Sequence, residues 1–143
     1  MMIRKSLWLE LAPDAAFRLF CEDIGEWWPR GFAEGSKLVL AGRVGGRLFE
    51  RRTDGTEYEI GRVTAYEPPS VVAFTWKAPS WSRSTQVEIR LKQERNGTRL
   101  ELEHGGWETD PKINEYKDNY DTGWETILEQ YQAAVRARLG GGP

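Results

Sequence analysis

Between residues 37 and 106 the sequence consists of short apolar-polar alternations that are separated by tight-turn signals. Alternation with a period of two is typical of strands whose two faces meet different environments. Two-residue breaks rich in glycine, asparagine and aspartate connect neighbouring antiparallel strands. These breaks are Gly45-Gly46, Asp54-Gly55 and Asn96-Gly97, and Pro68-Pro69 ends a further stretch. The region is therefore predicted to form an antiparallel meander, and no other part of the chain restricts the fold as strongly.

Helical patterns flank these predicted strands on both sides. A first strand over residues 3–11 precedes a helix that begins at Pro13, a residue that suits the first helical position. A second short helical turn, EWW at 26–28, ends before Pro29. From about 115 to 139, apolar residues recur at three- and four-residue steps, which predicts a long amphipathic helix. Gly123 within that helix indicates a close approach of its backbone to something bulky.

A sheet with one apolar face must cover that face, and the long C-terminal helix is the element available for this. The predicted fold class is therefore α+β, with an antiparallel sheet packed against the helix, and curvature of the sheet would leave a pocket between the layers. We expect a single domain over residues 1–139 and a disordered tail over 140–143, where the chain ends in GGGP.

Composition narrows the classes of partner. The formal net charge of −2 gives no electrostatic reason to bind nucleic acid or an anionic membrane. No apolar run is long enough for a membrane span, so no membrane insertion is expected. The single cysteine, Cys21, fits a reducing cytosol and predicts a cytoplasmic location. One histidine and one cysteine cannot complete a zinc site, and no glycine-rich phosphate fingerprint occurs, so we expect neither a metal nor a cofactor.

Strand alternation assigns the side chains that face the interior. In TRLELEH, Leu102 and His104 lie on the inner face, while Glu101 and Glu103 face water. In RLFERR, Leu48 and Glu50 are assigned inward, because the alternative would leave two arginines on the apolar face. The pocket is therefore expected to be lined by Trp28, Leu48, Glu50, Phe74, Trp76, Arg83, Val87, Leu102, His104, Tyr120 and Trp124.

His104 is the only histidine of the chain, and Glu50 is an inward carboxylate available to share a proton with it. A histidine–carboxylate pair in apolar surroundings can act as an acid–base unit, because burial and pairing shift both pKa values. The alternatives are a satisfied polar cluster in the interior, or an anchor for the polar end of a ligand. Glu50 and His104 are therefore the candidate catalytic residues, and the three interpretations stay open.

Seven tryptophans are many for 143 residues and require an explanation. Trp27 and Trp28 are adjacent and cannot share a helix face, so we expect one in the core and the other over the mouth of the pocket. Trp81 and Trp107 are expected to rim the opposite mouth. Exposed tryptophans also mark contacts between proteins.

Seven segments of the sequence carry a resemblance to a known family: EWWPR (26–30), VGGRLFE (44–50), DGTEYEIGRV (54–63), YEPPSVVAFTW (66–76), TQVEIRL (85–91), NGTRLELEHGGWE (96–108) and YDTGWETIL (120–128). In this order, the segments resemble the SRPBCC or START-like helix-grip superfamily, which includes the birch-pollen-allergen-like proteins. Within it, the similar group is that of the activator of the heat-shock-protein-90 ATPase.

The resemblance implies a helix-grip fold, in which a curved antiparallel sheet wraps around the C-terminal helix and two short helices follow the first strand. It further implies an elongated hydrophobic cavity between sheet and helix, and homodimers as one form of assembly. The eukaryotic activator carries a separate N-terminal domain that engages the chaperone. This sequence shows no counterpart of that domain, which argues against a chaperone partner.

Three functions follow as hypotheses. The leading one is a binding protein for a small hydrophobic molecule, with Glu50, His104, Arg83 or Tyr120 orienting the polar end of the ligand. The second is an enzyme of the cyclase or hydrolyase type that uses Glu50 and His104 for proton transfer. The third is an interaction protein resembling a chaperone regulator, with a closed core and with Trp27 or Trp81 in the contact.

Overall fold

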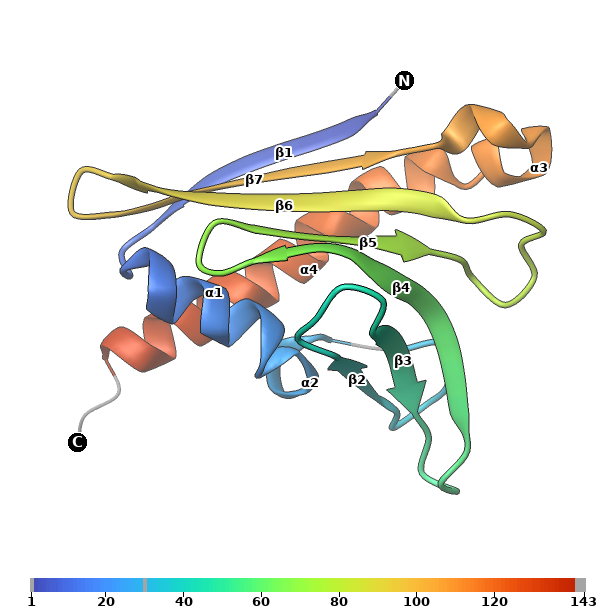
Figure 1. Cartoon of the computed structure of the whole chain (residues 1–143), viewed down its shortest axis with the longest axis horizontal. Coiled ribbons are helices and arrows are strands. Elements are labelled where there is room, and N and C mark those ends of the chain that lie inside the picture. The colour runs from blue at the N-terminus through green and yellow to red at the C-terminus, as the bar shows by residue number, and fades with distance from the viewer. Residues whose placement is uncertain (1, 30, 141–143) are drawn as a thin grey trace.

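The computed structural model describes residues 2–29 and 31–140, which form one seven-stranded sheet with a long helix along one face (Figure 1). The strands are β1 (Ile3–Leu9), β2 (Lys37–Leu40), β3 (Arg47–Arg51), β4 (Glu57–Glu67), β5 (Val71–Trp76), β6 (Thr85–Glu94) and β7 (Gly97–Gly105). The helices are α1 (Pro13–Cys21), α2 (Ile24–Trp27), α3 (Pro111–Asn114) and α4 (Lys117–Leu139), with a 3-10 turn η1 (Trp107–Thr109) before α3.

The sheet is an antiparallel meander, as the turn signals predict. Its strand order is β1-β7-β6-β5-β4-β3-β2, so β2 to β7 lie side by side in the order in which they follow in the chain. β1 is added at the far edge through antiparallel pairing with β7. β1 therefore lies beside the strand that carries His104, and Ile3 is the register partner of His104.

The long strand β4 bends the sheet. Its first half pairs with β3 and its second half pairs with β5, and the register shifts in both pairings. Such irregularities bend the strand and increase its twist. Figure 1 shows β4 curving downward, so that β2 and β3 turn away from the plane of the other strands. The resulting half-barrel leaves room on its inner side for α4.

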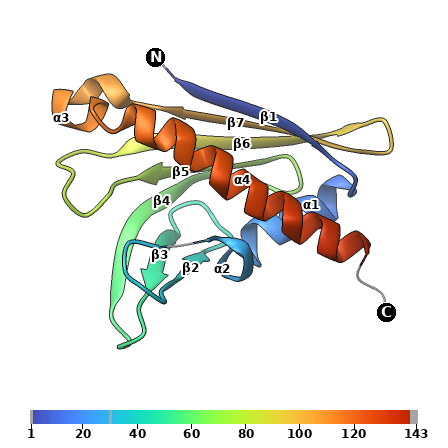
Figure 2. The same cartoon turned by 180° about the vertical axis from the view of Figure 1, so that it is seen from behind.

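Helix α4 crosses the inner face of the sheet, while α1 and α2 close one end (Figure 2). Its buried residues recur at three- and four-residue steps, as the sequence predicts: Trp124, Leu128, Tyr131 and Val135. This arrangement confirms the predicted α+β fold, with a curved sheet around a C-terminal helix and short helices after the first strand. Among the described residues, no helix has both the length and the apolar composition needed to cross a bilayer.

The inward assignment of β3 is confirmed. Leu48 and Glu50 are fully buried on the inner face. Phe49 lies on the opposite face and is nevertheless buried, because the guanidinium of Arg47 covers its ring at 4.1 Å and that of Arg51 lies at 5.4 Å. The outer surface of β3 therefore presents cationic side chains, with the aromatic ring beneath them.

The sequence gives two expectations for the C-terminal region, one for Gly123 in α4 and one for the tail that follows the helix. The expected close approach at Gly123 is wrong, because a Cβ added there would meet no atom within 4 Å. The expected tail starts at Gly140, whose backbone N–H still donates to the Arg136 carbonyl at 2.8 Å. The rest of that tail, residues 141–143, lies outside the described residues.

The open space at Gly123 gives a stability prediction. Gly123→Ala should raise the free energy of unfolding by about 1 kcal/mol, because alanine restricts the unfolded chain and favours the helix. The matched control is Gly25→Ala in α2, where the new Cβ would lie 2.7 Å from the Leu38 carbonyl oxygen and should destabilise the protein. Urea denaturation of the three proteins measures both changes, and a loss of stability in Gly123→Ala would contradict the prediction.

Candidate ligand-binding site

An apolar pocket of about 150 Å³ lies between the curved part of the sheet, the segment after α2 and the N-terminal half of α4. It is lined by Trp28, Gly31, Phe32, Leu38, Ile60, Trp76, Tyr120 and Ile127. None of these described residues is charged. Larger hollows beside α2 and beside α3, of about 410 and 660 Å³, are lined largely by charged and other polar residues. The apolar pocket is therefore the place in the described structure where a hydrophobic ligand fits best.

Aromatic rings form most of the pocket wall. The Trp76 ring has its centroid 5.8 Å from those of Trp28 and Phe32 and 6.3 Å from that of Tyr120. These separations are typical of attractive ring contacts. Phe32 is 39% exposed and forms the outer wall of the pocket. The pocket is partly open to solvent, and movement of this ring would widen the opening.

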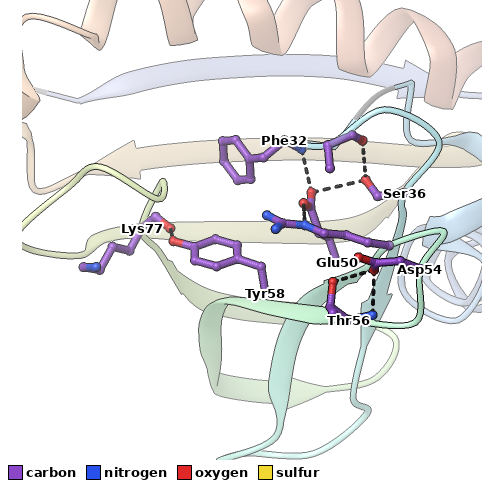
Figure 3. A network of polar contacts seen from close by, with 9 residues as sticks. Phe32, Ser36, Glu50, Asp54, Thr56, Tyr58 and Lys77 are labelled. Atoms are coloured by element: carbon purple, nitrogen blue, oxygen red, sulfur yellow. Dashed lines mark hydrogen bonds and ion pairs between the residues drawn. The ribbon is translucent and has the colours of Figure 1, made fainter.

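The loop at 31–36, which carries Phe32, is fastened to β3 by the carboxylate of Glu50 (Figure 3). The Phe32 backbone N–H donates to Glu50 Oε2, and the Ser36 hydroxyl lies 3.2 Å from the same oxygen. Arg52 Nε donates to Oε1 at 2.8 Å. Glu50 is 0% exposed, so these donors take the place of water around the carboxylate. A buried acidic group thus holds the outer wall of the pocket in place.

Gly31 is required by the same arrangement. A Cβ at this position would collide with Glu50 Oε2 and with the Ser36 hydroxyl. The backbone of the loop can approach the carboxylate only because residue 31 has no side chain.

The hairpin between β3 and β4 supports the Glu50 contacts. Glu50 and Tyr58 are cross-strand partners, and the Tyr58 hydroxyl donates to the Lys77 carbonyl at 2.7 Å. At the tip, Asp54 accepts bonds from the backbone and the hydroxyl of Thr56, which lower the pKa of the Asp54 carboxyl (Figure 3). The hairpin predicted from Asp54-Gly55 is therefore confirmed, and it places Glu50 opposite the ring that supports Phe32 at 5.9 Å.

His104 is fully buried, and both of its ring nitrogens are used. The indole N–H of Trp124 donates to His104 Nδ1 at 3.0 Å, and His104 Nε2 lies 2.7 Å from Thr85 Oγ1. An indole N–H can only donate, so Nδ1 must accept and the ring hydrogen must lie on Nε2. Thr85 accepts that hydrogen and donates its own to the Trp76 carbonyl at 2.9 Å. These bonds fix His104 as a neutral connection between α4, β6 and β7.

Burial lowers the pKa of His104 to about 3, because the apolar surroundings disfavour the charged ring. The imidazole is therefore neutral through the physiological range. Its ring packs against Trp107, with the centroids 4.4 Å apart. Of the three interpretations of His104, the contacts match the satisfied polar cluster in the interior.

Glu50 and His104 are not brought together. Glu50 lies on β3 and His104 on β7, and β4, β5 and β6 lie between them in the sheet. Each has its own set of partners, and within the described part of the chain no hydrogen bond joins them. The proton-transfer pair proposed from the sequence is therefore wrong in its geometry. Alternation identified the face of each residue but not the distance along the curved sheet.

The other predicted lining residues divide into two groups. Trp28, Trp76 and Tyr120 line the pocket. The residues buried in the core instead are Leu48, Phe74, Val87, Leu102 and Trp124. They fill the space in which an elongated cavity was expected. Arg83 is exposed in the loop before β6, because the strand begins at Thr85 and the alternation does not extend to it.

Several residues of the pocket are absent from the sequence prediction. Ile60 and Ile127 follow the strand and helix periodicities and could have been found from them. Gly31, Phe32 and Leu38 lie in the loop or at the sheet edge, where periodicity gives little information. Among the predicted rim residues, Trp81 and Trp107 are buried and pack against each other at 5.7 Å between centroids.

Trp27 is also buried, and its indole N–H donates to the Leu19 carbonyl at 2.9 Å. Trp27 is thus the core member of the adjacent pair, and Trp28 lies at the pocket. Because Trp27 and Trp81 are both buried, neither provides the exposed contact that the interaction hypothesis assigned to them.

Other reactive groups do not form a second site in the described residues. Cys21 is buried in α1, and burial raises the pKa of its thiol to about 12, so it behaves as a small apolar side chain. In residues 2–29 and 31–140 no group of three or more potential metal ligands gathers in one place.

The curved sheet, the enclosed C-terminal helix and the pocket between them define a helix-grip protein of the SRPBCC superfamily. The chain belongs to the family described as Activator of Hsp90 ATPase homolog 1-like protein, or AHSA1, whose model matches residues 11–136. None of the curated proteins matches the chain.

Solved structures share the fold at low identity. Protein MLL2253 from Mesorhizobium loti is similar over 96% of this chain and 98% of its own, with 20% identity and a TM-score of 0.74. The Aha1 dimer from Colwellia psychrerythraea is similar over 94% and 96%, with 19% identity and a TM-score of 0.72. The AHSA1 protein from Silicibacter pomeroyi is similar over 96% and 99%, with 22% identity and a TM-score of 0.70. These likenesses extend over nearly the whole chain.

Proposed function

We propose that this protein binds a small, uncharged and mostly apolar molecule in the pocket between Trp28, Phe32, Trp76 and Tyr120. The observation that carries the proposal is a pocket of about 150 Å³ with an aromatic wall and no charged lining residue among those described. An apolar cavity of roughly this volume can hold a benzene-sized molecule. The pocket as it stands therefore accommodates one ring.

The structure of the outer wall supports access to this pocket. Phe32 is held by contacts with the rings of Tyr58 and Trp76, and its side chain is partly exposed. The loop backbone is held separately, through Glu50. The pocket is already partly open, and rotation of the Phe32 side chain would widen the opening, or enlarge the pocket for a longer ligand, without breaking the bonds to Glu50.

Binding is the activity that the pocket residues support best. The wall carries no carboxylate or imidazole among its described residues, so it has no acid–base pair for a cyclase or hydrolyase reaction. The helix-grip fold of the AHSA1 family is compatible with a ligand between sheet and helix. We place this binding activity in the cytoplasm, for which the single, free Cys21 is the supporting feature.

A pocket-filling substitution tests the proposal with toluene as the probe. Toluene at ten times its dissociation constant should stabilise the wild-type protein by about 1.4 kcal/mol, which thermal unfolding can detect. Ile127→Trp should abolish this stabilisation, because the larger ring fills the pocket from α4. The matched control is Gln130→Trp, at an exposed position of the same helix, which should bind toluene as the wild type does. No toluene effect in the wild type, or an equal effect in Ile127→Trp, would contradict the proposal.

We also propose that the protein forms a homodimer. The supporting observation is that the similar Aha1 of Colwellia psychrerythraea is described as a dimer. Sedimentation equilibrium should give twice the chain mass of 16.4 kDa, and a single-chain mass at high protein concentration would refute the proposal.

A further inference from the structure

The pocket wall is apolar except for a few polar hydrogens. Among its lining residues, Trp28, Trp76 and Tyr120 have side chains that can donate hydrogen bonds. The indole N–H of Trp76 donates to the Tyr120 hydroxyl oxygen at 2.9 Å. This contact joins β5 to α4 in the wall of the pocket.

The direction of that bond determines whether the Tyr120 hydroxyl still has a hydrogen to donate. The indole nitrogen has no lone pair to accept with, so the Tyr120 oxygen must be the acceptor. The hydroxyl hydrogen of Tyr120 is therefore not used by Trp76, and it has no acceptor among the described residues. The neighbouring Tyr58 differs in this respect, since its hydroxyl donates to the Lys77 carbonyl. Tyr120 thus offers a hydrogen to whatever occupies the space beside it.

We propose that Tyr120 donates this hydrogen bond to the ligand, and that the pocket therefore selects uncharged ring compounds that carry an acceptor oxygen, such as aromatic ketones. The inference rests on the proposed function, because it assigns a ligand class to the same pocket. A purely hydrocarbon ligand would leave the Tyr120 hydrogen without a partner, which is unfavourable in a desolvated site.

The protonation state of the Tyr120 hydroxyl agrees with a role as hydrogen-bond donor. Burial raises the pKa of its hydroxyl, so the group keeps its hydrogen at physiological pH. Among the described lining residues there is no charged side chain, and the neutral Tyr120 hydroxyl is matched to a neutral acceptor, a ketone or ether oxygen.

Two probes of the same shape test the inference. Acetophenone and α-methylstyrene differ only in the replacement of the ketone oxygen by a CH₂ group. The ratio of their dissociation constants, measured by calorimetry, should change by about fivefold in favour of α-methylstyrene in Tyr120→Phe relative to the wild type. Using the ratio removes any general effect of the substitution on the pocket. Tyr58→Phe is the matched control and should leave the ratio unchanged, because the Tyr58 hydroxyl is already bonded to the backbone.

A second measurement requires only the wild-type protein. The carbonyl stretching frequency of bound, isotope-labelled acetophenone should lie below its value in an apolar solvent, because a hydrogen bond weakens the C=O bond. A ratio unchanged in Tyr120→Phe, or a carbonyl frequency equal to that in the apolar solvent, would overturn the inference while leaving the pocket intact. If neither probe binds the wild type, the proposed function itself fails, and the inference fails with it.

Discussion

Lowering the pH from 7 to 5 is expected to remove about 2 kcal/mol of the free energy of unfolding through His104 alone. In the folded protein, burial lowers the pKa of His104 to about 3 from its usual value of 6.5. Below pH 6.5 the unfolded chain binds a proton at this residue, whereas the folded protein does not until about pH 3. The contribution of neutral His104 to the free energy of unfolding is therefore fully present above pH 6.5. This contribution falls by about 1.4 kcal/mol for each pH unit between the two pKa values.

The contribution of His104 can be separated from that of the carboxylates. In His104→Gln, the side-chain amide can accept from Trp124 and donate to Thr85, but it does not titrate. Urea denaturation at pH 7, 6 and 5 should show a steeper loss of stability in the wild type than in the variant. Equal pH dependence in the two proteins would mean that His104 takes up its proton in the folded state near its usual pKa.

Arg52→Met is expected to lower the free energy of unfolding by about 3 kcal/mol. Glu50 is 0% exposed and its Oε1 accepts from Arg52, so removal of the guanidinium leaves a buried carboxylate without its counter-charge. Arg52 itself is 35% exposed, so the loss arises mainly on the Glu50 side of the pair. Because Glu50 also holds the loop at 31–36, the same variant should loosen the outer wall of the pocket.

Arg51→Met is the matched control for this effect. Arg51 is 58% exposed, and its ion pair with Glu57 has a separation of 3.4 Å. Exposed pairs of this kind contribute at most about 1 kcal/mol. Chemical denaturation of both variants should therefore show a clearly larger loss for Arg52→Met. Similar losses in the two variants would show that the Glu50 carboxylate is solvated.

The faces of the strands could be predicted from the sequence, because a period of two leaves little ambiguity where one face is buried. Leu48 and Glu50 lie inward as alternation predicts, and so do Leu102 and His104. The inward assignment of Arg83 was wrong, because this residue precedes β6 and alternation applies only within the strand.

The open space inside the fold could not be predicted. Side-chain packing determines which inward residues touch one another, and Phe74 and Trp124 fill volume that a pattern of faces leaves undecided. The pocket also depends on Gly31 and Phe32, whose positions follow from the bonds between a loop and Glu50. Those bonds join residues far apart in the sequence, and no local pattern indicates them.

The separation of Glu50 from His104 has a related cause. Alternation assigns both to one surface, but the strand order places three strands between them. In a curved sheet, residues on the same face can serve different regions. Glu50 accepts hydrogen bonds from the loop after α2, whereas His104 connects α4 to β6 and β7.

The two ways in which the outer wall is held imply two rates of ligand exchange. Rotation of the partly exposed Phe32 ring breaks no hydrogen bond, and such side-chain motions occur within about a nanosecond. Displacement of the loop at 31–36 must break its bonds to the buried Glu50 carboxylate, and motions of this kind are slower by orders of magnitude. A compound with one ring needs at most the first motion to leave this partly open pocket, while a longer molecule needs the second. Residence time in the pocket should therefore rise steeply with ligand size, independently of affinity.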